Sequence, residues 1–197
     1  MKHINLEILL IILSISLACS HIATGQDNNR EPINAGADRA LLFGRDVIST
    51  GMFERDAALS PDGKTFFFTV RFTREMAAIV YSQKTEGSWS TPKIAAFSGN
   101  HYDIEPVFHP DGKRLFFVSN RPLNEEGNPK DFDIWYVERR KDGWSKPVNP
   151  GKPLNREGNE FYPSFTSDGS VYFTAQRENT IGGEDLYVCA YRDGQYQ

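Results

Sequence analysis

The sequence predicts an all-β protein: a β-propeller built from four-stranded antiparallel blades, with about three blades present as an incomplete ring. Three observations support this prediction. One frame of turn and strand residues occurs three times, at intervals of roughly 50 residues, which suits one blade each. Short aromatic and β-branched runs, separated by Gly, Pro and Asp, fill each frame. No long stretch has the periodicity of an amphipathic helix.

Each repeat is organised around a tight turn that joins two strands. The first two copies carry Pro-Asp-Gly-Lys at 61–64 and 110–113, and the third carries Ser-Asp-Gly-Ser at 167–170. Proline presets φ at the second turn position, Asp bonds nearby backbone N–H groups, and Gly tolerates a positive φ. We therefore expect positive φ at Gly63, Gly112 and Gly169.

Every blade is expected to contain an inner strand before the turn, two further strands after it and a short outer strand. The predicted ranges are 56–60, 65–71, 78–83 and 92–96 in blade one, 105–109, 114–120, 132–139 and 146–149 in blade two, and 162–166, 170–177 and 185–191 in blade three. A single such sheet cannot bury both faces, whereas radial stacking of blades does so. A sandwich of unrelated hairpins would not explain the repeated frame.

The first 40 residues are interpreted as targeting sequence. Residues 1–18 have a basic start, a short apolar core and a small last residue, the pattern of a signal peptide. The stretch Ser16-Leu17-Ala18-Cys19 resembles a bacterial lipobox, which implies lipidation of Cys19; the alternative is an ordinary signal peptide cut nearby. Residues 19–40 are polar and predict a flexible tether. The partial propeller then spans 41–197, with blades at about 54–100, 101–158 and 159–197.

Composition excludes several partners. The net charge is −4 and no basic cluster is present, which argues against nucleic acid. Membrane contact is expected through the lipid anchor only. Cys189 is the one cysteine after Cys19, so no internal disulfide is predicted, and we interpret it as a core residue. His101 and His109 lack the spacing of a zinc pair, and neither a metal nor a cofactor is predicted.

The repeat resembles the PD40, or WD40-like, repeats of TolB-type β-propellers. The residues that carry the resemblance are Pro61-Asp62-Gly63-Lys64, Pro110-Asp111-Gly112-Lys113, and Arg177 followed by Gly182-Gly183-Glu184-Asp185-Leu186-Tyr187. It extends from about Leu42 to the end, although blade one has Ala78 where the others have Asp133 and Asp185. The resemblance implies a bacterial envelope protein with protein partners, periplasmic or anchored at the outer membrane. Propellers host many activities, so it leaves the function open.

Acidic residues recur at fixed places in the repeat. Eight residues before each turn Asp stand Glu54, Asp103 and Glu160, and six residues before it stand Asp56, Glu105 and Tyr162. We expect these residues near one mouth of the central channel. They could form a site for a cation or polar ligand, or they could pair with Arg71, Arg121 and Arg177. The ion pairs are favoured, because a Ca²⁺ cage needs about 6–8 oxygen ligands on a suitable loop.

Two classes of function fit the sequence. The first is an exported, non-catalytic binding or scaffold module in the cell envelope, which engages a protein, peptide or glycan through the channel mouth or a blade edge. The alternative is a propeller-fold enzyme that acts on glycans, or the propeller portion of a peptidase. No Gly-x-Ser-x-Gly elbow is present, which disfavours a peptidase domain within the chain. Arginine-paired carboxylates would favour binding, whereas two carboxylates about 5–10 Å apart in an open pocket would favour glycosidase chemistry.

The two ends of the chain predict a truncated propeller. Residues 194–197 align with the start of the outer hairpin of a blade, and Phe43–Ser49 is interpreted as the outer strand of a last blade. An open arc of blades would expose apolar faces and unpaired strand edges, and would therefore favour self-association.

Lipidation of Cys19 can be tested directly. In a bacterial host, labelled fatty acid should enter the wild-type protein, and Cys19→Ala should release the protein into the soluble fraction. An acylated cysteine gains about 0.8 kcal/mol per buried CH₂, which is why several acyl chains hold a protein on a membrane. Unlabelled wild-type protein with unchanged fractionation would instead identify a plain signal peptide.

Overall fold

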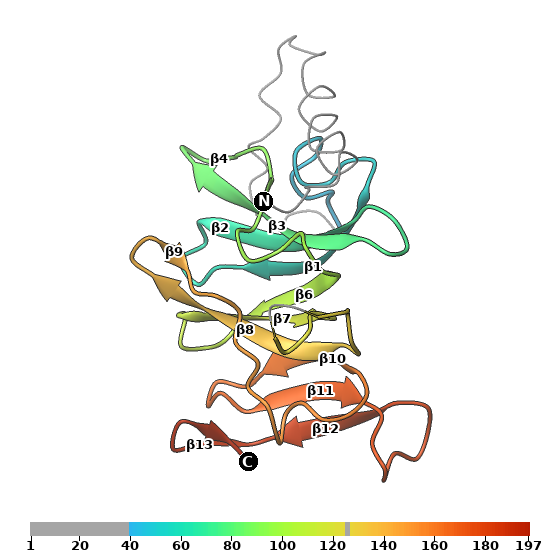
Figure 1. The fold of residues 1–197 in the computed structure, drawn as a ribbon. Coiled ribbons are helices and arrows are strands. Elements are labelled where there is room, and N and C mark those ends of the chain that lie inside the picture. Colours follow the sequence, from blue (N-terminus) through green and yellow to red (C-terminus); the bar gives the residue numbers. More distant parts are fainter. Residues whose placement is uncertain (1–39, 125–126) are drawn as a thin grey trace.

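The computed structural model describes residues 40–124 and 127–197, so the predicted signal peptide, Cys19 and the tether up to residue 39 lie outside the described residues. The described chain folds into three antiparallel blade sheets that stack face to face, with a separate two-stranded hairpin, β13–β14, beside the last (Figure 1). Neither described range contains a helix, and thus none that could cross a membrane. The prediction of an all-β fold with three successive blades, stacked as an open arc, is confirmed.

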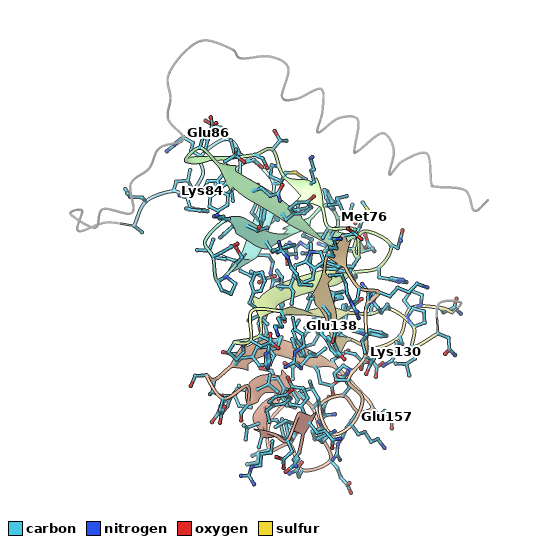
Figure 2. The ribbon with its side chains drawn as sticks, turned by 90° about the vertical axis from the view of Figure 1, so that its left-hand side faces the viewer. Met76, Lys84, Glu86, Lys130, Glu138 and Glu157 are labelled. Atoms are coloured by element: carbon cyan, nitrogen blue, oxygen red, sulfur yellow. The ribbon has the colours of Figure 1, made fainter. Side chains whose placement is uncertain are left out.

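The strands follow the repeat. Blade one contains β1 (Phe53–Leu59), β2 (Thr65–Arg71), β3 (Ala77–Thr85), β4 (Ser88–Trp89) and β5 (Lys93–Ile94). Blade two contains β6 (Asp103–Phe108), β7 (Arg114–Ser119), β8 (Asp133–Arg140) and β9 (Gly143–Trp144). Blade three contains β10 (Glu160–Phe165), β11 (Val171–Ala175), β12 (Asp185–Cys189), β13 (Tyr191–Arg192) and β14 (Gln195–Tyr196). The Glu86 hairpin of blade one lies near one end of the stack and Glu157 toward the other (Figure 2).

The inner strands β1, β6 and β10 begin earlier than predicted, because each contains a β-bulge that the sequence pattern does not reveal. The register of β1 with β2 shifts between Arg55 and Ala58, and the other two inner strands shift at the equivalent place. The bulged residues Asp56, Glu105 and Tyr162 have φ of 59°, 57° and 55°. A non-glycine residue in this left-handed region is uncommon, and its occurrence three times in register marks a built feature of the repeat.

The outer strands are shorter than predicted. In blade one only β5 pairs with β3 in the expected range, and in blade two the range shrinks to a single bridge between Tyr136 and Val148. Phe43–Ser49 is not a strand: the N–H groups of Val47, Ile48 and Ser49 all donate to the Gly44 carbonyl, at 3.0, 2.7 and 3.2 Å. The chain forms a turn here, which places Ile48 in the apolar cluster on blade one.

The core lies between the blades. We call the side of a blade that faces the next blade its rear face. Phe67 and Ile79 on the rear face of blade one pack against Leu115, Phe117 and Trp135 of blade two. In the same way, the rear face of blade two packs against blade three in a second cluster. Alternation of side chains along each strand thus buries both faces of the middle blade.

The rear face of blade three is exposed in the described chain. Its apolar residues Tyr172, Leu186 and Val188 have exposed fractions of 50%, 80% and 54%. Strand register makes Tyr172 equivalent to Phe116, and Val188 equivalent to Tyr136. The surface that blade two covers with the next blade is therefore open in blade three.

The turn glycines give a stability test. Gly63, Gly112 and Gly169 have φ of 68°, 67° and 89°, as the turn chemistry predicts. Gly63→Ala should lower the free energy of unfolding by about 1 kcal/mol, because alanine is strained at positive φ. Gly169→Ala should cost more, since its Cβ would lie 2.9 Å from the Tyr191 ring. Gly51 has open space and no positive φ, so Gly51→Ala is the control, measured by urea denaturation. Equal stability of the Gly63 and Gly51 variants would contradict the turn assignment.

Candidate functional site

Two of the three predicted carboxylate–arginine pairs form, and each is buried. Asp103, at the start of β6, is fully buried, and its Oδ1 lies 2.6 Å from Nη2 of Arg121. The Ser119 hydroxyl donates to the same oxygen at 2.6 Å. The Arg121 guanidinium also stacks over the rings of Phe117 and Trp135, at 4.8 and 5.5 Å. Desolvated charges must be paired in this way, because an isolated buried charge is costly.

The pair also joins blade two to blade one. Nη2 of Arg121 donates to the Phe97 carbonyl at 3.1 Å, in the segment that connects the two blades. The next residue, Ser98, donates to Oδ2 of Asp103 at 2.7 Å and accepts a bond from the Ile79 N–H at 3.0 Å. Arginine, carboxylate and connecting segment therefore form one unit that anchors blade two to β3. We call this unit the blade clamp.

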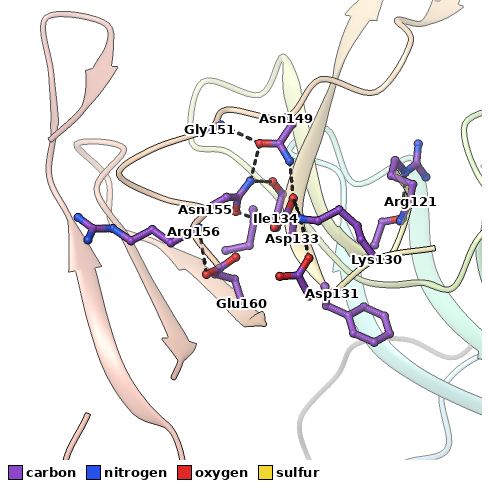
Figure 3. A network of polar contacts seen from close by, with 12 residues as sticks. Arg121, Lys130, Asp131, Asp133, Ile134, Asn149, Gly151, Asn155, Arg156 and Glu160 are labelled. Carbon is purple, nitrogen blue, oxygen red and sulfur yellow. Dashed lines mark hydrogen bonds and ion pairs between the residues drawn. The ribbon is translucent and has the colours of Figure 1, made fainter. Parts of the chain in front are cut away.

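A second blade clamp joins blade three to blade two, and Figure 3 shows its Glu160 with Asn155 and Ile134. Glu160 is fully buried and its Oε1 lies 2.6 Å from Nη1 of Arg177. Nη2 of Arg177 donates to the Leu154 carbonyl at 2.9 Å, as Arg121 does to Phe97. Asn155 then takes the place of Ser98: its Oδ1 accepts from the Ile134 N–H at 3.0 Å, and its Nδ2 donates to the Ile134 carbonyl at 2.8 Å.

Blade one has no such clamp, and the expected pairing of Glu54 with Arg71 is wrong. Arg71 lies opposite Phe53 in the sheet, with its guanidinium 4.8 Å from that ring. Glu54 instead accepts bonds from the backbone N–H of Thr50, at 3.0 Å, and from its hydroxyl.

The reason is register. The clamp arginine stands two residues after the residue that pairs with the acid across the first two strands. In blade one, Val70 pairs with Glu54, so the equivalent position is Phe72. In blade three the turn between the first two strands is one residue shorter than in blades one and two. The distance from the turn Asp to the arginine in blade three, when applied to blade one, therefore selects Arg71 and not Phe72. No hydrogen bond or ion pair joins Glu54, Asp103 and Glu160 to one another in the described chain, so they do not form a shared site.

The bulged residues form hydrogen bonds between neighbouring blades, which the repeat of acidic residues indicated without identifying the partners. The carboxylate of Asp56 accepts a bond from the backbone N–H of Glu105 at 3.3 Å, and the carboxylate of Glu105 accepts one from the N–H of Tyr162 at 2.6 Å. Each bulge thus binds the next, and we call this row the bulge ladder. Burial raises the pKa of Glu105 to about 7, against the opposing effect of the Tyr162 N–H. The recurrence of acids six residues before the turn Asp was the signal for it.

A second titratable group lies in the clamp of blade three. Burial raises the pKa of Glu160 to about 8; Arg177 opposes the shift and Asp133 adds to it. Oε2 of Glu160 and Oδ1 of Asp133 are buried without a hydrogen-bond partner in the described chain. The other oxygen of Asp133 is held by Lys130 and Asn149, each at 2.7 Å. A proton on Glu160 that bonds Asp133 satisfies both unpaired oxygens.

A cavity of about 1030 Å³ lies beside blade three, bounded by the segment that leads into it and by β12. Phe173, Tyr187 and Cys189 supply apolar surface, and Lys152 and Arg156 supply positive charge. Burial raises the pKa of the Cys189 thiol, which therefore lacks the thiolate character of a nucleophile. Among the described residues, no group of three His, Cys, Asp or Glu side chains could hold a metal ion.

No protein-family model matches the sequence, and no curated protein matches it significantly. Among solved structures, TolB from Acinetobacter baumannii is similar with a TM-score of 0.52 and 16% identity over 75% of this chain. A puromycin-hydrolyzing peptidase from Mycobacterium tuberculosis is similar with a TM-score of 0.53 and 14% identity over 77% of this chain. The chain spans 32% of the first structure and 22% of the second. The fold is therefore that of a TolB-like β-propeller.

The blade clamp predicts unequal effects for two arginines. Arg121→Met should lower the free energy of unfolding by about 3–5 kcal/mol, because it leaves the Asp103 charge buried without its partner. Arg71→Met should cost less than about 1 kcal/mol, the usual worth of an exposed cation–π contact. The double variant Asp103→Asn with Arg121→Met should recover part of the loss. Urea denaturation measures all three, and equal losses for the two arginines would refute the clamp.

The raised pKa of Glu160 predicts a pH-dependent stability. A carboxyl group with a higher pKa in the folded state binds its proton more tightly there, so its contribution is full below about 4.5 and is lost as the pH rises through about 8. Glu160→Gln keeps a donor toward Asp133 without a charge and should flatten this slope. Exposed Glu157→Gln is the control and should leave it unchanged. Stability curves between pH 4.5 and pH 8 that coincide for wild type and Glu160→Gln would contradict the assignment.

Proposed function

We propose that the protein is an exported, non-catalytic, TolB-like binding or scaffold module of the bacterial cell envelope, whose ligand is a protein, peptide or glycan. The signal-peptide pattern of residues 1–18 supports export, and Cys19 supports attachment to a membrane through a lipid anchor. The TolB-like fold supports the envelope as the setting, while the fold alone leaves the ligand open.

One observation supports the proposal: the acids of the blade clamps are paired with arginines inside the structure. Asp103 and Glu160 are each fully buried and held by an arginine at 2.6 Å. In this arrangement they join blades and do not face a substrate. The cavity beside blade three instead combines aromatic surface, positive charge and amide groups, as binding sites for peptides and glycans do.

The enzymatic alternative is less well supported. Glycan cleavage needs a proton donor and a second carboxylate that face one open pocket. Glu105, with a pKa of about 7, has the most suitable acidity. It is only 6% exposed, however, and already contacts Arg55 and the Tyr162 N–H. The similarity to a peptidase concerns the fold and adds no catalytic group to this chain.

Photo-crosslinking in cells tests the binding function. A benzophenone amino acid replaces Lys152, on the rim of the cavity, or Glu86, at the distant hairpin of blade one (Figure 2). We expect discrete adducts in the envelope fraction from position 152 and none from position 86. Adducts of equal yield at both positions would contradict a site at the cavity. Hydrolysis of chromogenic glycosides or peptides that disappears in Glu105→Gln would establish the enzymatic alternative.

A further inference from the structure

The contact between blades two and three, here called the second joint, contains two buried carboxyl groups that share a need for one proton. Oε2 of Glu160 and Oδ1 of Asp133 have no hydrogen-bond partner among the described residues. Arg177 lies 2.6 Å from the other oxygen of Glu160, and Lys130 holds the other oxygen of Asp133 at 2.7 Å. Two ionised carboxylates at this distance from water repel each other, whereas a shared proton turns their contact into a hydrogen bond.

The equivalent acid at the contact between blades one and two, the first joint, has partners for both oxygens. Oδ1 of Asp103 accepts bonds from Ser119 and Arg121, each at 2.6 Å. Oδ2 accepts bonds from the Ser98 hydroxyl at 2.7 Å and the Gly99 N–H at 3.3 Å. The first joint is therefore closed without an added proton, and the second joint is not.

His109 lies at the other end of the inner strands of the second joint: Glu160 begins β10, whereas His109 follows the last residue of β6. The imidazole is 4% exposed. It packs against the Phe165 and Tyr191 rings of blade three, with centroids 5.1 and 5.5 Å away. A Cβ at Gly169 of blade three would lie only 3.0 Å from its Nε2. This ring is therefore part of the surface on which blade three docks.

The polar groups that face His109 include one anion and one cation. Oδ2 of Asp111 lies 3.0 Å from Nδ1, and the Asp111 N–H donates to the same nitrogen at 3.2 Å. Nη2 of Arg114 lies 3.2 Å from Nδ1 and 3.1 Å from Nε2, and donates to the Tyr191 hydroxyl at 3.1 Å. A proton on the ring places a second cation beside Arg114 inside the joint. Burial and Arg114 accordingly lower the pKa of His109, although Asp111 opposes them.

The other two blades have no titratable ring at this position. Ser60 and Thr166 stand there, and each donates its hydroxyl hydrogen to the turn Asp of its own blade. A hydroxyl keeps this bond across the neutral range, whereas an imidazole changes its charge there. Among the three turns, the one with a group that gains charge near neutral pH is the one packed into the second joint.

We propose that protons control the docking of blade three on blade two, and that they act in opposite directions at the two ends of the second joint. A proton between Glu160 and Asp133 closes the joint, whereas a proton on His109 opens it. This device belongs to the fold and does not depend on what the protein binds.

The direction of each effect follows from proton linkage. The pKa of Glu160 is raised from 4.5 to about 8, so its proton stabilises the closed joint fully below 4.5, and this stabilisation is lost as the pH rises through about 8. The pKa of His109 lies below the ordinary 6.5, so the neutral ring stabilises the closed joint fully above 6.5. That stabilisation is lost as the pH falls through the lowered pKa.

Two further groups contribute at the same joint. Glu105 bonds the Tyr162 N–H across it at 2.6 Å, and burial raises the pKa of Glu105 to about 7, which adds to the loss of docking at alkaline pH. The charged groups that act on it are Arg55, Asp56 and Glu184. Cys189, which interacts with the charge of Glu160, has a pKa that burial raises. Each variant is therefore compared with wild type at the same pH.

Amide hydrogen exchange, measured by NMR on the full chain between pH 5 and pH 8, tests the proposal. The amide of residue 160 donates across the second joint to the Phe132 carbonyl at 2.8 Å, and the Ile134 N–H donates to Asn155 of its clamp at 3.0 Å. The Ile79 N–H makes the matching bond to Ser98 at the first joint, also at 3.0 Å. Protection factors at these amides remove the intrinsic pH dependence of exchange and read the opening of each joint.

Two variants should shift the protection of the second joint with opposite pH dependence. For Glu160→Gln, the ratio of its protection factor to that of wild type should rise with pH, by up to about tenfold per pH unit, because the variant has no proton to lose. For His109→Phe, which keeps a ring without a charge, the ratio should rise as the pH falls below 6.5. Tyr191→Phe removes one bond of the joint but keeps the imidazole, so its ratio should not change with pH.

A measurement on wild type covers the case in which His109→Phe does not fold. The imidazole proton signals of His109 should titrate with a midpoint below 6.5, and His109→Thr, the residue of blade three at this position, replaces the phenylalanine variant. A midpoint at or above 6.5 would overturn the proposal. So would a ratio that does not change with pH for either variant, ratios that change in the same direction, or a larger change at Ile79 than at Ile134.

Discussion

The buried pairing of one arginine with one carboxylate at each blade junction is the constraint on which the rest of this structure depends. In blades two and three the arginine lies 2.6 Å from an oxygen of the acid and also bonds a carbonyl of the connecting segment, Phe97 or Leu154. That second bond determines the path of the connection, so that Ser98 or Asn155 reaches the backbone of the preceding blade. A buried ion pair of this kind adds little net stability by itself, but it is costly to break and selects one arrangement. The apolar clusters between the blades then supply the favourable energy of burial.

The bulge ladder is a second link between blades, on the inner strands. The positive φ of a bulged residue turns its N–H toward the preceding blade, where a carboxylate side chain accepts it. The clamps act on the first and third strands and the ladder acts at the bulges, so two independent rows of contacts hold neighbouring inner strands together. At Tyr162 the ladder reaches a residue whose side chain is 58% exposed and carries no carboxylate. Both rows thus join blade three to blade two.

The structural role of the repeated carboxylates limits the functions that they can have. The repeat places carboxylates in every blade, which from sequence is compatible with metal binding, catalysis or structure. Burial and arginine contacts commit Asp103 and Glu160 to structure, and the raised pKa of Glu160 follows from the same burial. A cavity lies beside β12, where aromatic rings and positive charge come together. The arginine contacts of these two acids favour a binding role over chemistry at the channel mouth.

Much of the fold was predictable because it depends on local chemistry. The Asp-Gly turns require glycine at positive φ, and short aromatic strands with period-two alternation can only form stacked sheets. The pairing of Asp103 with Arg121 and of Glu160 with Arg177 also followed from the repeat, since both members of each pair recur in register. The pairing of Glu54 with Arg71 did not, because a one-residue difference in turn length moves a side chain to the other face of a strand.

The remaining features depend on contacts between distant parts of the chain. The bulges at Asp56, Glu105 and Tyr162, the roles of Ser98 and Asn155, and the turn at Phe43–Ser49 arise where one blade meets another segment in space. The sequence by itself determined the blade and its repetition, because turn and strand chemistry are local. Tertiary structure alone decided which acids are buried and which segments cover the edges of β3 and β8, because burial and edge pairing depend on what packs alongside.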